Sequence, residues 1–296
     1  MKNIVQIAIF LLQISIFFVV FSLGLQTSIA DATCLLRKPG LFIRSLLAMN
    51  VVMPLVAVVM AATFHVNPAV RVALVLVAVS PVPPLLPRQQ SKLGDSTYIK
   101  GLLACMSVLS IIVVPATIKV LGKVFARDIH ISPLAVAKVM LVTVLLPLAV
   151  GMLARRAAPR MAERMSTPLS GIAFLVVLVA GGVLLVVALP GMIALIGNGS
   201  VLAIAVFVAV GLAVGQSFGG PDHGESTALA LATASRHPGL ALAIATANFP
   251  NQRQAAVAAI LLYMTVRILV LVPYTLWRKH LLMGSGSVKP SSQRAA

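Results

Sequence analysis

Residues 80–87 read SPVPPLLP, and this stretch interrupts a long apolar segment that begins near residue 69. Each proline removes a backbone N–H and clashes with the preceding helical turn, so no straight helix passes through it. A second interruption, SRHPG at residues 235–239, stands in another apolar segment about half a chain later. Paired proline- or glycine-broken segments in matching places of two halves indicate a transporter built from inverted repeats.

Both interruptions are predicted to lie near the middle of a membrane, where irregular backbone must be buried in protein or line a wet cavity. Two breaks that cross present free N–H and C=O groups, and half-helix dipoles, to a bound solute. Independent proline kinks are the alternative interpretation. The break residues expected to shape the site are Ser80, Pro81, Pro83, Pro84, Ser235, Pro238 and Gly239.

The composition indicates that the chain lies in a membrane. Only 10% of its 296 residues are charged, 60% are apolar, and the mean hydropathy is +1.06. A globule of this size cannot hide so much apolar surface, and backbone groups in lipid must be satisfied within helices or a closed barrel. The apolar runs are about 20 residues long, the length of a spanning helix. The sequence therefore predicts an all-α polytopic membrane protein with the lipid bilayer as its solvent.

We expect about nine spans, two of them broken, arranged as an inverted repeat. The first repeat covers residues 1–122 with four spans, and the second covers residues 123–282 with five. A disordered cytoplasmic tail is predicted at 283–296. The predicted spans are 4–25, 41–64, 69–93 (broken), 96–121, 131–154, 168–190, 200–218, 224–248 (broken) and 253–279.

The net charge of +17 does not indicate nucleic acid, because most lysines and arginines sit at the ends of apolar runs. Sorted by side, fourteen basic residues fall on one side of the predicted spans and six on the other. The positive-inside rule then predicts a multi-pass inner-membrane protein with a cytoplasmic C-terminus and an outside N-terminus.

The first apolar segment has a second interpretation. Lys2, an apolar run and Ser28-Ile29-Ala30 before Asp31 resemble a signal peptide with its cleavage site. The run is longer than a usual signal-peptide core, and cleavage would force every later loop to invert. We therefore expect a true span.

Several features occur in a fixed order along the chain: an apolar helix ending at Ser80 and Pro81, the first break, Gly94-Asp95, a long helix with Pro115, a helix with Lys138, Pro147 and Gly151, and ASRHPGLA at residues 234–241. This order resembles the bile acid:sodium symporter family over roughly residues 15 to 280. The resemblance implies ten helices in two inverted five-helix repeats, divided into a core domain and a panel domain. The first family helix is expected to be missing here.

The resemblance also implies sodium coupling, which the residues at the breaks do not support. Sodium-coupled members resemble GGTASN at the first break, where residues 82–87 offer no hydroxyl or amide. At the second break, the family's Glu falls on Ala232 and its Gln-Asn pair on Arg236 and His237. A hard cation prefers several oxygen ligands, and a buried arginine repels it. Sodium is therefore not expected as the coupling ion.

Three cationic residues lie within predicted spans: Lys138, Arg236 and Arg267. A charge at the bilayer centre is costly unless it is paired or hydrated, and no acidic residue is predicted at that depth. A substrate anion is expected to supply the missing negative charge. The planar fork of Arg236 fits a carboxylate, sulfonate or phosphate, although this residue would alternatively cap carbonyls freed by the break. Arg267 faces the cavity or braces the break, and Lys138 is expected to snorkel outward.

His237, Asn50 and Asn248 complete the candidate substrate-binding set. A neutral imidazole can hydrogen-bond a substrate, and a titrating one can couple transport to protons. A structural role is commoner for a single histidine. Cys34 and Cys105 show no metal-ligand spacing, so neither a metal nor a cofactor is expected.

Taken together, these features predict a secondary transporter that moves a small organic anion, such as a bile-acid-like carboxylate or sulfonate, by alternating access. An enzyme is not indicated, because the chain lacks HExxH, GxSxG and paired intramembrane carboxylates. An ion-independent facilitator or channel, and a membrane sensor that transports nothing, are the alternative functions.

Overall fold

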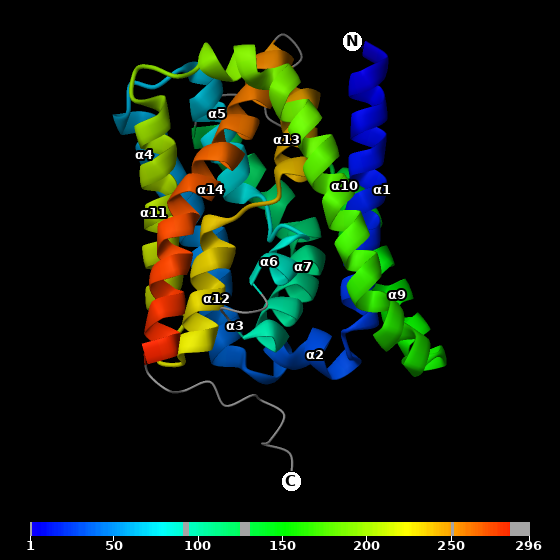
Figure 1. The fold of residues 1–296 in the computed structure, drawn as a ribbon. Helices are drawn as coiled ribbons and strands as arrows, with labels where there is room; N and C mark the ends of the chain where they lie inside the picture. The colour runs from blue at the N-terminus through cyan, green and yellow to red at the C-terminus, as the bar shows by residue number, and fades with distance from the viewer. Residues whose placement is uncertain (1, 91–94, 125–130, 250–251, 285–296) are drawn as a thin grey trace.

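A computed structural model describes residues 2–90, 95–124, 131–249 and 252–284 as a bundle of helices (Figure 1). Within these ranges, seven helical segments are long and apolar enough to cross a membrane. The predicted all-α polytopic membrane protein is thereby confirmed.

The helices of the first part of the chain are α1 (Lys2–Leu25), α2 (Ile29–Thr33), η1 (Cys34–Arg37), α3 (Pro39–Leu47), η2 (Ala48–Val52), α4 (Met53–Thr63), α5 (Pro68–Val79), α6 (Leu86–Gln90) and α7 (Ser96–Val124). Those of the second part are α8 (Pro133–Met140), η3 (Leu141–Leu145), α9 (Leu146–Ala157), α10 (Pro159–Ile193), α11 (Ser200–Phe218), α12 (His223–Ala234), α13 (Pro238–Asn248) and α14 (Arg253–Gly284).

The two spans expected to be broken are each assembled from short helices, α5 with α6 and α12 with α13. Neither pair contains a helix of spanning length, so the count of nine stays a prediction. Helix α1 begins at one end of the bundle and α14 finishes at the opposite end, as an odd number of crossings requires (Figure 1). Helix α14 continues to Gly284, and the rest of the predicted tail lies outside the described residues.

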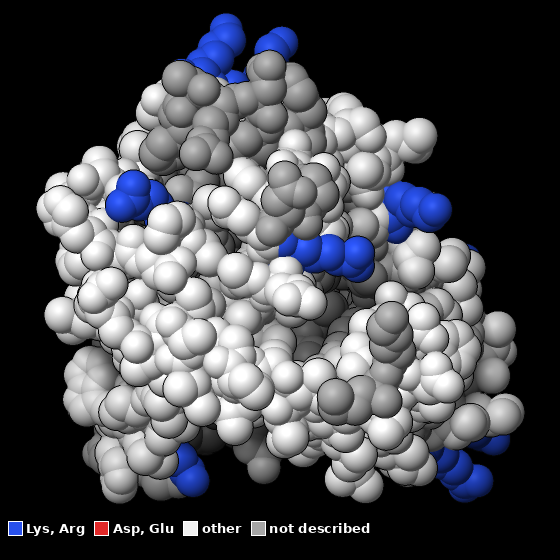
Figure 2. Space-filling view, turned by 90° about the horizontal axis from the view of Figure 1, so that it is seen from above, with Lys and Arg blue, Asp and Glu red and all other residues white. Residues whose placement is uncertain are grey.

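We call the end where α14 finishes the C-terminal face and the opposite end the N-terminal face. Viewed onto the N-terminal face, the surface carries scattered basic side chains and no visible acidic ones (Figure 2). The five acidic residues of the described ranges belong to α2 or to the starts of α7, α10 and α12, all at the C-terminal face: Asp31, Asp95, Glu163, Asp222 and Glu225.

The helices form two groups (Figure 1). Helices α8, η3 and α9 form one continuous helical segment, and α1, this segment and α10 pack together as the three-helix group on one side of the molecule. Helices α3 to α7, with η2, and α11 to α14 form the larger group, which contains both breaks, and α2 and η1 pack against α7 of that group. Helix α1 thus packs along two other helices of the bundle, and its role as a true span stays a prediction.

Two glycines let the helices of the three-helix group approach closely. A Cβ atom on Gly24 of α1 would lie 2.4 Å from the carbonyl oxygen of Leu148 in α9. A Cβ atom on Gly151 would lie 2.3 Å from the carbonyl oxygen of Phe21. In lipid, where helix association depends on van der Waals contact, such small residues allow close backbone packing.

The lone prolines Pro54 and Pro147 each follow a turn of π-helix. In η2 the N–H of Met53 reaches back five residues to the carbonyl of Ala48, and η3 precedes Pro147 in the same way. A π turn widens the helix and makes room for a proline ring that would otherwise clash with the turn before it. The register shift in η2 also affects the candidate site described below.

We predict that Gly24→Ala or Gly151→Ala separates α1 from α9, because the added methyl group would overlap backbone atoms. By analogy with overpacked cores, the loss of stability should be about 1–3 kcal/mol. The measurement is the thermal unfolding midpoint of the purified protein in detergent.

The matched control is Gly171→Ala on α10, where an added Cβ atom meets nothing within 4 Å. This variant should retain or slightly raise the midpoint, since alanine favours helix. An equal effect of all three substitutions would show that the α1–α9 contact is not close in the folded protein.

Candidate functional site

The two breaks contact each other in the middle of the larger group. Residues 80–85 separate α5 from α6, and residues 235–237 separate α12 from α13. The backbone N–H of His237 donates to the carbonyl of Pro81 at 2.9 Å. Arg236 Nη1 donates to the carbonyl of Ser80 at 3.2 Å. The breaks therefore cross at the place where the sequence predicted a site.

The prolines of the first break leave backbone carbonyls without their helical donors. In a continuous helix the carbonyl of Ser80 would accept from residue 84, but Pro84 has no N–H. Arg236 supplies that donor from the other break. The carbonyl of Val77, which loses its donor at Pro81, accepts from the Ser80 N–H at 3.0 Å instead.

The second break and the π turn free two more carbonyls. Pro238 cannot donate to the carbonyl of Ala234, which accepts from Tyr263 Oη of α14 at 2.9 Å. In η2 the N–H of Met53 donates to the carbonyl of Ala48 and not to that of Met49. The next residue that could donate to the Met49 carbonyl is Pro54, which has no N–H.

Arg236 also donates to the Met49 carbonyl, with its Nη2 at 2.8 Å from the oxygen. Its side chain is 0% exposed, and it joins the first break, η2 and the second break. The alternative role expected for Arg236, capping carbonyls freed by the break, thus describes its observed contacts. Nε has no hydrogen-bond partner, and binding of a substrate by Arg236 stays a prediction.

His237 caps α13. Its Nδ1 accepts from the Leu240 N–H at 3.2 Å, and its Nε2 lies 3.4 Å from Thr143 Oγ1 in η3 of the three-helix group. The Thr143 hydroxyl donates to the Val139 carbonyl, so its oxygen is available to accept. This pattern fits a neutral imidazole with its proton on Nε2. Protonation of Nδ1 would remove the cap.

Arg267 is buried without a partner. It is 6% exposed, its Nε has no hydrogen bond, and no hydrogen bond or ion pair joins it to the described part of the chain. It lies one turn after Tyr263 on α14. The hydroxyls of Thr233 and Ser235, beside the second break, are also buried and unpartnered. These groups are donors without acceptors in the interior of a membrane protein.

The other predicted binding residues lie at different distances from the crossing. Asn50 belongs to η2, next to Met49, and its Nδ2 lies 3.8 Å from the sulfur of Met106. Asn248 ends α13, about 15 Å along the helix from its start, and donates to the Ile244 carbonyl. The structure thus places Asn50 near the crossing and Asn248 away from it. Lys138, expected to snorkel, is exposed on α8.

The sequence model of the Sodium Bile acid symporter family matches residues 13–198, which is more than half of the chain. The chain belongs to the sodium bile acid symporter family. The matched range includes the first break and ends before the second. A search of curated proteins found no match to this chain.

The residues at the crossing do not fit the sodium ion that the family name implies. Carbonyl oxygens such as those of Met49 and Ser80 are the ligands a hard cation prefers. In this symporter-family protein the guanidinium of Arg236 already donates to both. A second cation beside that fixed charge would be repelled in a medium of low dielectric constant. The guanidinium of Arg236 thus occupies the carbonyls that a cation at the crossing would need.

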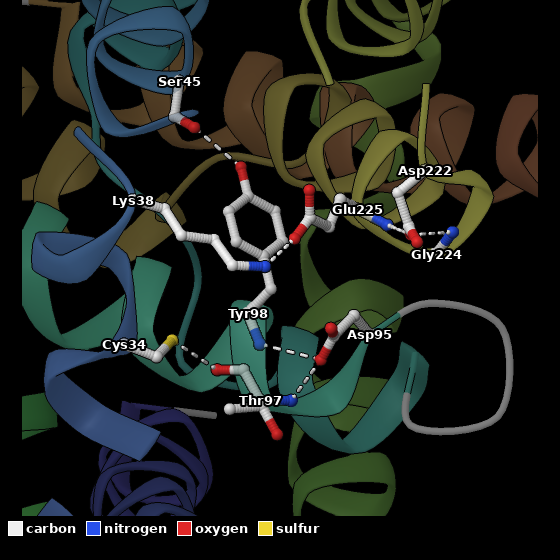
Figure 3. A network of polar contacts seen from close by, with 9 residues as sticks. All are labelled: Cys34, Lys38, Ser45, Asp95, Thr97, Tyr98, Asp222, Gly224 and Glu225. Atoms are coloured by element: carbon white, nitrogen blue, oxygen red, sulfur yellow. Dashed lines mark hydrogen bonds and ion pairs between the residues drawn. The ribbon is translucent and has the colours of Figure 1, made fainter. Parts of the chain in front are cut away.

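A polar network at the C-terminal face joins the starts of three helices (Figure 3). Asp95 caps α7 by accepting from the Thr97 and Tyr98 N–H groups at 2.8 and 3.0 Å. Asp222 caps α12 in the same way. The N–H of Asp95 donates to the carbonyl of Gly224 at 3.2 Å, which connects the two caps.

Two side-chain pairs extend this network to α3. Lys38 Nζ forms an ion pair with the carboxylate of Glu225, and the hydroxyls of Ser45 and Tyr98 share a 2.6 Å hydrogen bond (Figure 3). The partner of Glu225 was missed, because Lys38 lies 187 positions away and nothing local in the sequence points to it.

Replacement of Tyr263 by Phe is predicted to destabilise the crossing. The hydroxyl is the donor for the Ala234 carbonyl, and a buried carbonyl left unpaired costs about 1–3 kcal/mol. The unfolding midpoint in detergent measures this loss. Tyr274→Phe is the matched control, because its partner Gln216 is a half-buried side chain that can turn to another donor. Equal losses in the two variants would contradict the special role of Tyr263.

The ion pair at the C-terminal face predicts a pH dependence. The hydrogen bond to Glu225 raises the pKa of Lys38 above its ordinary value of 10.5. Its stabilisation is therefore complete below pH 10.5 and is lost as the pH rises through the higher pKa of the folded state. Because Lys38 is 58% exposed, the pair contributes at most about 1 kcal/mol.

The measurement compares wild type with Lys38→Met across alkaline pH. The difference between their unfolding midpoints should stay constant up to about pH 10 and close above the ordinary lysine pKa. A difference that closes near neutral pH would contradict the assignment.

Proposed function

We propose that this protein is a secondary transporter that binds a small organic anion beside the two crossed breaks and carries it across the membrane. The observation that carries the proposal is Arg267, which is 6% exposed, has no hydrogen bond or ion pair to the described part of the chain, and has a buried Nε without a partner. A charge at this depth is costly unless it is paired or hydrated. A substrate carboxylate or sulfonate would supply the pairing charge.

The surroundings of Arg267 favour an anion over a cation. Arg236 adds a second buried positive charge, and the acidic residues of the described ranges lie at the C-terminal face. Arg236 Nε and the hydroxyls of Thr233 and Ser235 are further unpartnered groups near the second break. A planar guanidinium binds a carboxylate or sulfonate through two parallel hydrogen bonds.

Anion binding is proposed to be independent of sodium. A bound cation would bring a positive charge to the carbonyls at the crossing, and Arg236 already brings one there by donating to two of them. Proton coupling through His237 is a weaker proposal. The Nδ1 atom caps α13, so a proton taken up there would break an existing hydrogen bond.

Alternating access would move the larger group, which holds the crossed breaks, against the three-helix group. The contact between His237 and Thr143 lies between the two groups at the level of the crossing. We propose that the C-terminal face is cytoplasmic, as the positive-inside rule predicts for the side with more basic residues.

An ion-independent facilitator is the second candidate. A cation fixed in the chain is not carried across with the substrate, so transport need not be coupled to an ion gradient. Uptake into proteoliposomes separates the two functions. Accumulation above the outside concentration, driven by an ion or proton gradient, supports secondary transport, and simple equilibration supports a facilitator.

The binding site is tested by thermal stabilisation of the purified protein with a panel of carboxylates and sulfonates. A specific ligand stabilises the folded state by RT ln(1 + [L]/Kd), so stabilisation should grow with ligand concentration and should not require sodium. Arg267→Gln should abolish it. Arg253→Gln, at the exposed start of the same helix, is the matched control and should leave it unchanged.

Two outcomes would overturn the proposal. If the anions stabilise Arg267→Gln as much as wild type, Arg267 is not part of the binding site. Stabilisation that appears only with sodium would show that the crossing accepts a cation despite Arg236. Arg267→Gln is preferred to a change at Arg236, whose loss would leave two buried carbonyls unpaired and risk misfolding.

A further inference from the structure

Arg88 connects the first broken span to the three-helix group. It lies on α6, the short helix that follows the break. Its Nη1 donates to the hydroxyl of Ser170 on α10, and its guanidinium carbon lies 4.6 Å from the centre of the Phe174 ring. Ser170 and Phe174 are four residues apart and share one face of α10, so one guanidinium engages both.

An apolar contact accompanies this polar one. Leu85, the last residue before α6, packs on a cluster that contains Val19 of α1 and Ala173 and Val177 of α10. Phe174 borders the same cluster. The first broken span therefore meets the three-helix group through both a cation and a leucine.

These contacts lie between the break and the C-terminal face, because α6 leads toward the start of α7 at that face (Figure 1). At the opposite end, a groove of about 390 Å³ lies between the two groups. It is lined by Ile111, Ile112, Pro115, Ala116 and Lys119 near the end of α7, and by Ile131 and Pro133 near the start of α8. Seen onto the N-terminal face, the surface is also hollowed (Figure 2). The groove is local to α7 and α8, because the end of α10 packs on the start of α14 at the same face, where a Cβ atom on Gly191 would lie 3.2 Å from Ala258.

We propose that Arg88 and Leu85 form a latch that closes the passage between the two groups on the C-terminal side. The latch holds α6 against α10 in this conformation and releases when the larger group moves. Both contacts suit a reversible closure, since they are made by side chains and leave the helical backbone hydrogen bonds intact. The latch deepens the proposed transport function, because a passage open at both ends would dissipate a gradient.

The test measures the access of water to the latch, and it needs no substrate. Val177→Cys places a thiol under the latch, at a position that is 9% exposed. It is made in a Cys34→Ser, Cys105→Ser background, which removes the two native thiols. A membrane-impermeant maleimide is then applied to each side of vesicles that contain the full chain.

Labelling of Val177→Cys should be slow from both sides. Adding Arg88→Ala should raise the labelling rate severalfold from the C-terminal side alone. Phe174→Leu, which keeps an apolar side chain but removes the aromatic ring, should act in the same direction and guards against a fold defect in Arg88→Ala. Arg164→Ala, an exposed arginine at the start of α10, is the matched control and should change nothing.

Unchanged labelling in both Arg88→Ala and Phe174→Leu would overturn the latch, as would a rise from the N-terminal side. The result is separable from the proposed function. If no anion stabilises the protein and the labelling still responds to Arg88, the latch stands and the anion site fails. If anions bind through Arg267 and the labelling ignores Arg88, the site stands and the latch fails.

Discussion

Each backbone carbonyl that a proline leaves without a donor in lipid must find another donor. The freed carbonyl of Val77 accepts from the nearby Ser80 N–H, whereas those of Met49, Ser80 and Ala234 accept from the side chains of Arg236 and Tyr263. Water is scarce at this depth, so none of these contacts is easily replaced. The crossing is consequently a hydrogen-bonded joint, and α5, η2, the second break and α14 are held together as one body.

The same constraint determines the charge of the site. A neutral donor would satisfy the freed carbonyls equally well, but an arginine satisfies two at once and brings a positive charge that carbonyl dipoles offset only in part. Arg267 lies one helical turn after Tyr263, which contacts the second break. The interior of the larger group therefore holds two buried arginines, Arg236 and Arg267. In the proposed function, structural capping and selection for anions are therefore two consequences of one residue, and Arg236 need not be released from its carbonyls to favour a negative ligand.

The positions of the breaks could be predicted from the sequence because a proline disrupts only the helical turn next to it. The observed interruptions at residues 80–85 and 235–237 fall inside the predicted ranges, and the family resemblance is confirmed. The π turns before Pro54 and Pro147 were not predicted, because a single proline in the sequence is compatible both with a simple kink and with a π turn that shifts the helical register. The partners of Arg236 were not predicted either, because Met49 is 187 positions away and only the tertiary fold brings it there. Asn248 was grouped with the site by polarity alone, and its place at the far end of α13 follows from helix length.

The distribution of hydrogen bonds also indicates where the molecule can move. Within the larger group, the breaks are held by donors to buried backbone carbonyls, and separating them would leave those carbonyls unpaired. Between the larger group and the three-helix group, the polar contacts at the breaks are His237 with Thr143 and Arg88 with Ser170, which are side-chain pairs that water can replace once the interface opens. At the level of the breaks, motion along this boundary therefore separates side-chain pairs, whereas motion within the crossing would leave several backbone carbonyls unpaired. A rigid crossing beside a side-chain interface is the arrangement that the proposed alternating access requires, because the breaks would then move as one body without losing their own hydrogen bonds.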